Sequence, residues 1–183
     1  MLLNEHIYDF DMDAALQLLS DQRRAQVLRY KHELGRRLSV AAYLLLCEGL
    51  RNKYGIEEKP LFTYGEHGKP ALLGHPGIHF NLSHCKEAVI CVLDDKPVGV
   101  DIEMVRPYKE SLARYTMNEE EWQQIQRAAS RELEFTRLWT QKEAVLKLQG
   151  DGIRGDMKMV LSLHPVPIQT VVSENKKYVY SVC

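Results

Sequence analysis

The chain has 183 residues, of which 45% are hydrophobic and 27% are charged. This length and composition predict a globular protein with one larger domain or two small half-domains. The formal net charge of −1 excludes a general attraction to nucleic acid or to membrane surfaces, so any site for an anion must be local. The longest apolar run, residues 40–47, is far too short to span a bilayer.

The first part of the sequence is patterned mainly for helices. Apolar residues at helical spacing predict helices over residues 13–19 and 36–54, with an Arg-rich helix or loop between them. Gly55 follows the second helix in the position of a C-cap. Residues 57–77 are rich in Gly, Pro and charge, which predicts loops and one short strand at 61–65.

Strand and helix patterns alternate in the rest of the chain. The apolar residues 87–93, a turn at 94–97 and the returning stretch 98–103 predict a β-hairpin. Asn118 and Glu121 have the spacing of a capping box and predict the start of a helix. A strongly patterned helix is expected over residues 131–149, and Gly150 and Gly152 mark its end. Three short strands are expected after it, at residues 157–163, 167–173 and 176–182. This order of elements predicts an α+β protein.

Two carboxylates in the stretch 98–103, Asp101 and Glu103, are separated by one residue. On a strand this spacing places both side chains on one face, where like charges repel. A Mg²⁺ ion between them would relieve the repulsion, since Mg²⁺ takes few protein carboxylates and fills its shell with water and phosphate. Glu143 would supply a third oxygen ligand. The alternative, that both strand carboxylates are simply solvated, stays open on the residues alone.

The helix expected at 131–149 carries a second group of charged residues. Trp139, Glu143 and Lys147 recur every four residues and therefore lie near one line along the helix. Phe135 and Leu146 share the apolar stripe with Trp139, so the Glu–Lys edge borders buried surface. The alternative is an ordinary surface ion pair between Glu143 and Lys147, worth about 0.2–0.5 kcal/mol.

A phosphate-containing substrate needs cations and hydrogen-bond donors as well as a metal. Residues 23–37 contain six Lys or Arg and one Glu, a positive segment that is either an anion site or a solvated helix face. Lys69 stands in a Gly-Lys-Pro turn, and Ser83 and His84 end an Asn-Leu-Ser-His stretch, where both can donate to a phosphate. A nucleophilic Ser–His pair is disfavoured, because adjacent residues of an extended chain point to opposite sides.

Taken in order, these motifs resemble those of the 4′-phosphopantetheinyl transferases. The similarity is greater to the longer, pseudo-dimeric surfactin-synthetase-activating type than to the short trimeric holo-acyl-carrier-protein synthase. GVDIE followed by WxxKEAxxK is highly specific, whereas GKP and NLSH are weak signals singly. The matching segments are the arginine pair 36–37, GKP at 68–70, NLSH at 81–84, GVDIE at 99–103 and WTQKEAVLK at 139–147.

The resemblance implies transfer of the 4′-phosphopantetheine group of coenzyme A to a serine of an apo acyl or peptidyl carrier protein, with Mg²⁺ and with release of 3′,5′-ADP. By position, Asp101, Glu103 and Glu143 are implied as Mg²⁺ ligands. Glu143, Lys147 and His84 are implied as catalytic residues, Glu143 by helping to deprotonate the serine and the other two at the pyrophosphate. The residues implied in binding coenzyme A are Lys31, Arg36, Arg37, Lys69, Pro70, Ser83, His84 and Lys147.

The resemblance also implies the architecture and the partners. We expect an α+β fold of two similar α/β halves forming a pseudo-dimer: residues 1–96 for the nucleotide of coenzyme A and residues 97–183 for Mg²⁺ binding and catalysis. The pseudo-dimeric type implies a monomer. The cysteines form no CxxC pair and no secretory signal opens the sequence, so we expect a cytoplasmic setting. The net charge and the short apolar runs lead us to expect no nucleic-acid or membrane partner. Residues 104–117 mix cationic and apolar side chains and are the expected docking surface for an acidic carrier helix, with an ordinary connecting loop as the alternative.

Two other functions remain open on the residues. One is a Mg²⁺-dependent hydrolase of a nucleotide diphosphate, which would use water and need no partner surface. The other is a non-catalytic module that binds coenzyme A, which would have no reason to keep both Glu143 and Lys147 near the carboxylate pair.

Overall fold

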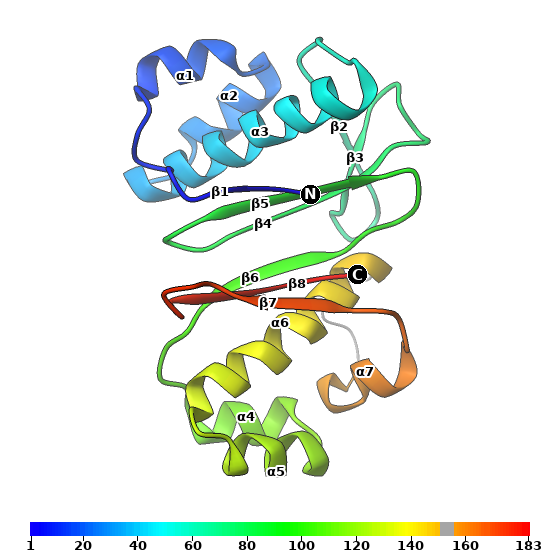
Figure 1. The fold of residues 1–183 in the computed structure, drawn as a ribbon. Helices are drawn as coiled ribbons and strands as arrows, with labels where there is room; N and C mark the ends of the chain where they lie inside the picture. The colour runs from blue at the N-terminus through cyan, green and yellow to red at the C-terminus, as the bar shows by residue number, and fades with distance from the viewer. Residues whose placement is uncertain (151–155) are drawn as a thin grey trace. The chain divides into compact units, whose positions relative to one another are not determined.

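The computed structural model of the protein describes residues 1–150 and 156–183. The chain divides into two compact units, Met1–Val98 and Gly99–Cys183, both drawn in Figure 1. Within the described ranges, no helix is both long and apolar enough to cross a lipid bilayer.

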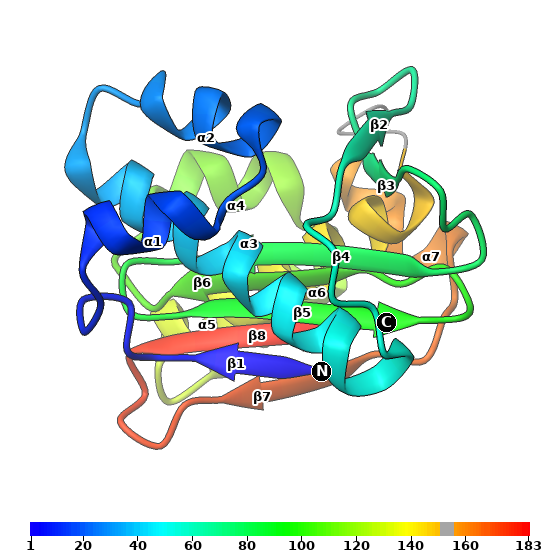
Figure 2. The ribbon, with the colours of Figure 1, turned by 90° about the horizontal axis from the view of Figure 1, so that it is seen from above.

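The first unit is built on a three-stranded antiparallel sheet with one long helix packed on it. The strands lie in the order β1 (Leu2–Asn4), β5 (Val89–Asp94) and β4 (His79–His84). Helix α3 (Glu33–Tyr54) packs mainly against β5 and also contacts β1 and β4. Figure 2 shows this helix crossing the sheet.

Smaller elements complete the first unit. Helices α1 (Met12–Leu18) and α2 (Asp21–Leu28) both pack on α3. Helix α2 includes the first part of the Arg-rich segment, which was expected to be either a helix or a loop. Each of the two helices begins at a side chain that accepts a hydrogen bond from the first helical turn, Asp11 for α1 and Ser20 for α2. Strands β2 (Phe62–Tyr64) and β3 (Pro70–Leu72) form a separate antiparallel hairpin.

Helix α3 forms where the apolar stripe was expected. Gly55, with a left-handed φ of 68°, caps its end, as predicted. The helix starts at Glu33, three residues before the expected start at residue 36. The prediction missed this first turn because it is mainly polar and lies ahead of the apolar stripe. The residues of the stripe are all buried in the core of this unit: Leu38, Ala41, Ala42, Leu45 and Leu46.

The second unit is also a three-stranded antiparallel sheet with a long helix on it. The strand order is β6 (Val100–Met104), β8 (Tyr178–Val182) and β7 (Gln169–Val172). Helix α6 (Arg131–Gln149) packs against β6 and β8 and has the predicted bounds, with Gly150 as its C-cap. The expected contribution of Gly152 to this stop lies outside the described residues.

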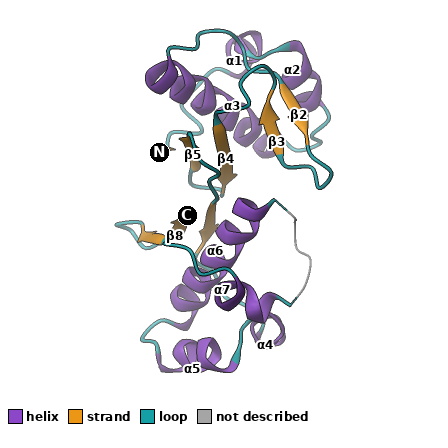
Figure 3. Ribbon diagram, turned by 90° about the vertical axis from the view of Figure 1, so that its right-hand side faces the viewer, coloured by secondary structure: helices purple, strands orange, loops and turns teal. Residues whose placement is uncertain are grey.

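Four further helical elements complete the described part of the second unit. Helix α5 (Glu119–Arg127) packs on α6 and begins with the predicted capping box of Asn118 and Glu121. Helix α4 (Glu110–Thr116) precedes it, and a 3₁₀ turn η1 (Met157–Met159) leads into the short helix α7 (Val160–Leu163). Figure 3 shows the helices and the sheet of each unit as separate layers.

The two units repeat one topology. In each, the first strand pairs with the last strand, and the last strand pairs with the one before it. In the described part of each, the first strand is followed by three helices, and the third of these helices packs on the sheet. The second unit also has η1 and α7 between that helix and its next strand. The fold is therefore α+β with two similar halves, as expected.

Two expectations about local structure were wrong, and one helix was not expected. Residues 87–93 and 98–103 do form strands, but they do not form a hairpin: β5 pairs with β4 and β1, whereas β6 pairs with β8. The stretch 157–163 is helical rather than extended, because Met157 and Val160 are buried at helical spacing. Residues 110–116 form α4, a stretch for which no helix or strand was expected.

Candidate active site

Strand β6 of the second unit holds the carboxylate pair of the GVDIE motif. Asp101 is buried, and Glu103, two residues on, is half-buried. Their spacing puts both on the same face of the strand, as predicted. Lys147 of α6 reaches this face, where its Nζ donates to Oδ1 of Asp101 at 2.6 Å. The positive group at the carboxylate pair is therefore a lysine of the same chain.

Glu143 lies one turn before Lys147 on α6, and its electrostatics tie it to the same carboxylates. Burial raises the pKa of Glu143, and the negative charge of Asp101 raises it further, while Lys147 lowers it. Burial likewise raises the pKa of Glu103, and Asp101 adds to that rise, while Arg106 and Lys147 oppose it. The three carboxylates thus share one electrostatic environment with Lys147.

The close approach of α6 to β6 depends on Gly99, the first residue of the GVDIE motif. A Cβ added to Gly99 would meet the carbonyl oxygen of Ala144 and would lie 2.7 Å from the backbone nitrogen of Leu148. Both atoms belong to the backbone of α6, which cannot move aside easily. The motif therefore needs glycine here for packing, which the sequence alone did not reveal.

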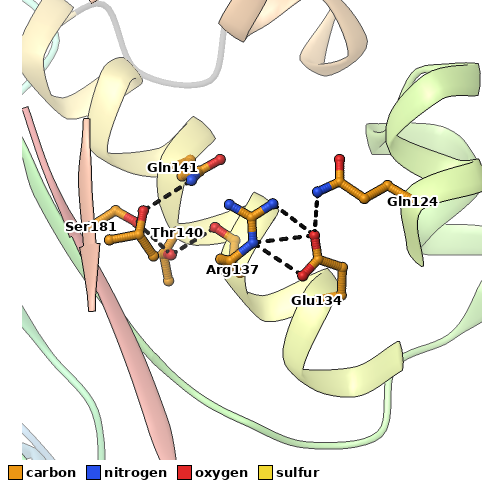
Figure 4. A network of polar contacts seen from close by, with 7 residues as sticks. Gln124, Glu134, Arg137, Thr140, Gln141 and Ser181 are labelled. Atoms are coloured by element: carbon orange, nitrogen blue, oxygen red, sulfur yellow. Dashed lines mark hydrogen bonds and ion pairs between the residues drawn. The ribbon is translucent and has the colours of Figure 1, made fainter. Parts of the chain in front are cut away.

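Hydrogen bonds also hold α6 in register on the sheet. Oγ1 of Thr140 lies 2.9 Å from Oγ of Ser181 on β8, and Ser181 is the residue paired with Asp101 across the strands. Nε2 of Gln141 donates to Oγ1 of Thr170 at 2.9 Å, and that oxygen lies 3.0 Å from Oγ of Ser181. Figure 4 shows this group beside the contacts that Glu134 makes.

The contacts of Glu134 link α6 to α5. Nη2 of Arg137 lies 2.7 Å from Oε1 of Glu134, and Nε2 of Gln124 on α5 donates to the same oxygen at 2.6 Å (Figure 4). The helix that bears Glu143 and Lys147 is thus held on both sides, by β8 and by α5. No pattern in the sequence pointed to these residues, because hydroxyl and amide side chains are common on helices.

A cavity of about 350 Å³ opens beside Glu103. Phe135 and Trp139 of α6 line it, and their rings lie 5.9 Å apart. Arg106 and Lys109, from the segment expected to dock a carrier protein, line it as well. The cavity therefore combines an aromatic wall with cationic side chains next to one of the candidate metal ligands.

In the first unit, the structure brings together two of the residues expected to bind coenzyme A. Lys31, just before α3, and His84, the last residue of β4, line one cavity of about 630 Å³. Arg36 lies on the first turn of α3, where its Nε donates to the carbonyl oxygen of Tyr30, another residue of that cavity, at 2.8 Å. Arg37 is engaged differently, by Glu33 at 3.0 Å and by the carbonyl oxygen of Phe10 at 3.2 Å.

The other expected residues of the first unit lie on two strands. Ser83 is buried on β4, and the alternation along the strand places it on the face opposite to His84. Lys69 ends the turn between β2 and β3, where its carbonyl oxygen accepts from the backbone of Gly65 at 3.0 Å. Pro70 opens β3 and is paired with Tyr64.

The structure does not present a ready-made metal centre. Within residues 1–150 and 156–183, no three His, Cys, Asp or Glu side chains are gathered closely enough to hold a metal ion. The chemistry of the donor set nevertheless suits a hard cation such as Mg²⁺, because Asp101, Glu103 and Glu143 all offer carboxylate oxygens. Burial raises the pKa of Glu103 and Glu143, and the nearby charge of Asp101 raises both further, as expected where carboxylates approach one another.

Comparison with known proteins adds a family match. The family model of the 4′-phosphopantetheinyl transferase superfamily matches residues 97–181, which include every candidate residue of the second unit. The chain is 32% identical to the 4′-phosphopantetheinyl transferase HetI of Nostoc sp. (strain PCC 7120) over 84% of this chain and 68% of HetI.

Two relatives from Bacillus are also similar. The 4′-phosphopantetheinyl transferase psf-1 of Bacillus pumilus is 33% identical over 74% of this chain and 59% of that protein. The 4′-phosphopantetheinyl transferase Sfp of Bacillus subtilis (strain 168) is 27% identical over 75% of this chain and 63% of Sfp. The chain therefore spans less than two thirds of the length of these two relatives.

Proposed function

Because this chain belongs to the 4′-phosphopantetheinyl transferase superfamily, we propose that it transfers the 4′-phosphopantetheine group of coenzyme A to a serine of an apo acyl or peptidyl carrier protein. In this reaction the serine oxygen forms a bond to the phosphorus that carries pantetheine. The bond from that phosphorus to the bridging oxygen breaks, and 3′,5′-ADP leaves.

The observation that carries the proposal is the contact of Lys147 with Asp101, with Glu103 and Glu143 in the same environment. Transfer of a phosphoryl-type group is mostly a matter of positioning and of neutralising charge. A cluster of three carboxylates and a lysine, set on a rigid helix–sheet pair, supplies the groups for both tasks.

Each residue of the cluster has a proposed role. Asp101, Glu103 and Glu143 would hold Mg²⁺, which when bound neutralises pyrophosphate charge and acidifies a nearby hydroxyl. The raised pKa of Glu143 suits it to accept the proton of the serine, directly or through a water. Lys147 would stabilise the negative charge that develops on the leaving group, and His84 would contribute to the same end.

The first unit is proposed to bind the nucleotide part of coenzyme A. The cavity lined by both Lys31 and His84 supports this role, because the two side chains can each donate a hydrogen bond to a phosphate. Arg36 and Arg37 would hold the 3′-phosphate. Lys69, Pro70 and Ser83 are proposed to line the nucleotide site. The roles of residues 1–96 and 97–183 would then be nucleotide binding and catalysis.

We further propose that the chain acts as a monomer and that the carrier protein docks on residues 104–117. Arg106 and Lys109 support that docking, since both are exposed next to Glu103 in the cavity of the second unit. A reducing, cytoplasmic setting is supported by the four cysteines, which form no disulfide among the described residues.

One experiment separates this proposal from the two alternatives. The protein is incubated with coenzyme A, Mg²⁺ and an apo carrier protein, and the carrier is weighed by mass spectrometry. We expect the carrier to gain the mass of one phosphopantetheine group, and to gain nothing when its acceptor serine is replaced by alanine. Release of nucleotide without a change in carrier mass would indicate a hydrolase, and binding of coenzyme A without either product would indicate a binding module.

A further inference from the structure

Lys142 belongs to the segment 139–147 but turns away from the carboxylates of β6. Its side chain is completely buried, with an exposed fraction of 0%. Its Nζ lies 2.8 Å from Oε2 of Glu121 on α5 and donates to the carbonyl oxygen of Met157 in η1 at 2.8 Å. Lys142 and Glu143 are neighbours on the helix, so their side chains point about 100° apart around its axis.

The oxygen Oε2 of Glu121, which lies beside Lys142, makes a second contact. It also accepts from the backbone nitrogen of Asn118 at 2.8 Å, which is one half of the capping box that starts α5. The side chain of Glu121 is only 8% exposed. One buried oxygen therefore joins the start of α5 to α6, and the ammonium group of Lys142 extends the junction to η1.

From this geometry we propose that Lys142 is a positioning residue. It fixes the rotation of α6 through Glu121 and so sets Glu143 and Lys147 against β6, without touching a substrate itself. The two lysines of the motif then have separate tasks, Lys147 at the carboxylates and Lys142 in the packing behind them. This inference rests on the proposed function, because it names a residue that supports the proposed site.

The burial of the pair argues against a direct role for Lys142 at a phosphate. If Lys142 swung toward a substrate, the carboxylate of Glu121 would be left buried without its cation, and breaking a buried pair in this way is strongly destabilising. The contact to Met157 would be lost as well. Lys142 is therefore committed to its partners in the fold.

Stability alone does not require a charged pair at this position. Replacing a buried ion pair by well-packed apolar residues is often neutral or stabilising. A charged pair differs from apolar packing in its directional contacts, which select one arrangement of the elements that it joins. For a reacting group, that selection matters, because a displacement of about 1 Å can lower a rate by about 10²-fold.

The test compares Lys142→Met, Glu121→Gln and the double variant with the wild-type protein in carrier modification. Glu121→Gln has the same shape and keeps an oxygen that can accept from both Asn118 and Lys142, so it disturbs the packing less than Lys142→Met does. The double variant removes both charges and leaves no buried ion without its counter-charge. We expect both single variants to lower kcat per folded molecule by about 10²-fold while KM for coenzyme A stays within about twofold. The double variant should lose no more than the single variants, because both changes break one contact.

Three results would overturn the inference. The first is an unchanged kcat of the folded fraction in Glu121→Gln. If Lys142→Met is then active as well, the pair has a purely structural role. If Lys142→Met is inactive, Lys142 acts directly rather than through Glu121. The second is a KM for coenzyme A that rises more than tenfold in Lys142→Met at unchanged kcat. The third is a loss in the double variant equal to the product of the two single losses.

Amide hydrogen exchange of α6 separates a failure of this inference from a failure of the proposed function. If the wild-type protein modifies no carrier, the proposed function fails, and exchange decides the inference alone. We then expect faster exchange over residues 142–149 in Lys142→Met and Glu121→Gln but not in the control Lys176→Met, which makes the same change at an exposed residue outside α6. Equal exchange in all of these proteins would overturn the positioning role.

Discussion

Lys147 and Asp101 are 46 residues apart in sequence, and the ammonium group of one lies 2.6 Å from Oδ1 of the other. The side chain of Asp101 is 6% exposed and that of Lys147 is 30% exposed, so the pair spans the boundary between core and solvent. This contact joins the last turns of α6 to β6. It also places a cation within the group of carboxylates on which the proposed chemistry depends.

The Asp101→Asn variant tests the proposed metal role. Asparagine keeps the shape of the side chain and an acceptor for Lys147, so we expect a folded protein. Removal of one negative ligand should lower phosphopantetheinyl transfer by about 10²-fold or more, measured as carrier mass against time over a series of Mg²⁺ concentrations. Asp13→Asn, an exposed change on α1, is the control and should have wild-type activity. Full activity of Asp101→Asn at ordinary Mg²⁺ would refute the assignment.

The Gly99→Ala variant tests the close packing of β6 on α6. The added methyl group would collide with backbone atoms of Ala144 and Leu148, and overpacking of this kind destabilises by about 1–3 kcal/mol. We expect urea unfolding to show a loss in that range. Gly77→Ala is the matched control, since a Cβ at Gly77 meets nothing within 4 Å. Similar unfolding midpoints for the two variants would contradict the packing argument.

The double variant Arg36→Ala, Arg37→Ala tests the proposed 3′-phosphate site. Loss of the charge-assisted contacts should weaken coenzyme A by about tenfold or more, and 3′-dephospho-coenzyme A by less, in titration calorimetry. Arg24→Ala serves as the control, because this arginine pairs with Asp21 on the exposed side of α2. Equal weakening of both ligands would move the 3′-phosphate site elsewhere.

The double variant Arg106→Glu, Lys109→Glu tests carrier docking. Charges at the rim of an interface mainly steer encounter and are screened within about 8 Å at physiological salt. We therefore expect a higher KM for the carrier and a weaker dependence of that KM on salt, with the affinity for coenzyme A unchanged. The control is the double variant Lys176→Glu, Lys177→Glu, which makes the same change in net charge at the exposed turn before β8. A carrier KM that responds equally to both pairs would exclude a local docking surface.

The thiols of Cys91, which is buried, and of Cys47, which is partly buried, should be unreactive in the native protein. Burial raises the pKa of Cys47 from 9.0 to about 11 and that of Cys91 to about 12. At pH 8 only about one molecule in a thousand would carry the Cys47 thiolate, which is the reactive form. Alkylation followed by mass spectrometry should label both residues only after unfolding. Rapid labelling of Cys91 in the native state would contradict its placement.

The same shifts predict how stability depends on alkaline pH. A thiol whose pKa is higher in the folded than in the unfolded state favours folding below its unfolded value and loses that contribution as the pH rises. We expect the free energy of unfolding to fall as the pH increases from about 9 towards about 11. Replacing Cys47 by alanine should reduce this fall in a series of urea titrations.

Local structure was largely determined by the sequence. The apolar stripe of α3, the capping box at Asn118 and the bounds of α6 all follow from spacings of a few residues, which act within one or two turns of the chain. The two carboxylates of β6 share a face for the same reason, since alternation along a strand is a local property. The motif pair could also be recognised without any knowledge of the contacts.

Partners distant in sequence were decided only by the tertiary structure. The sequence predicts strands at residues 87–93 and 98–103, close to the observed β5 and β6. An apolar strand pairs well with several others, however, and the turn between these two did not select a hairpin. The burial of Lys142 against Glu121 was equally hidden, because a lysine on a helix usually lies in water. Such contacts depend on which faces pack together, and that choice is made by the burial of the whole core rather than by any one segment.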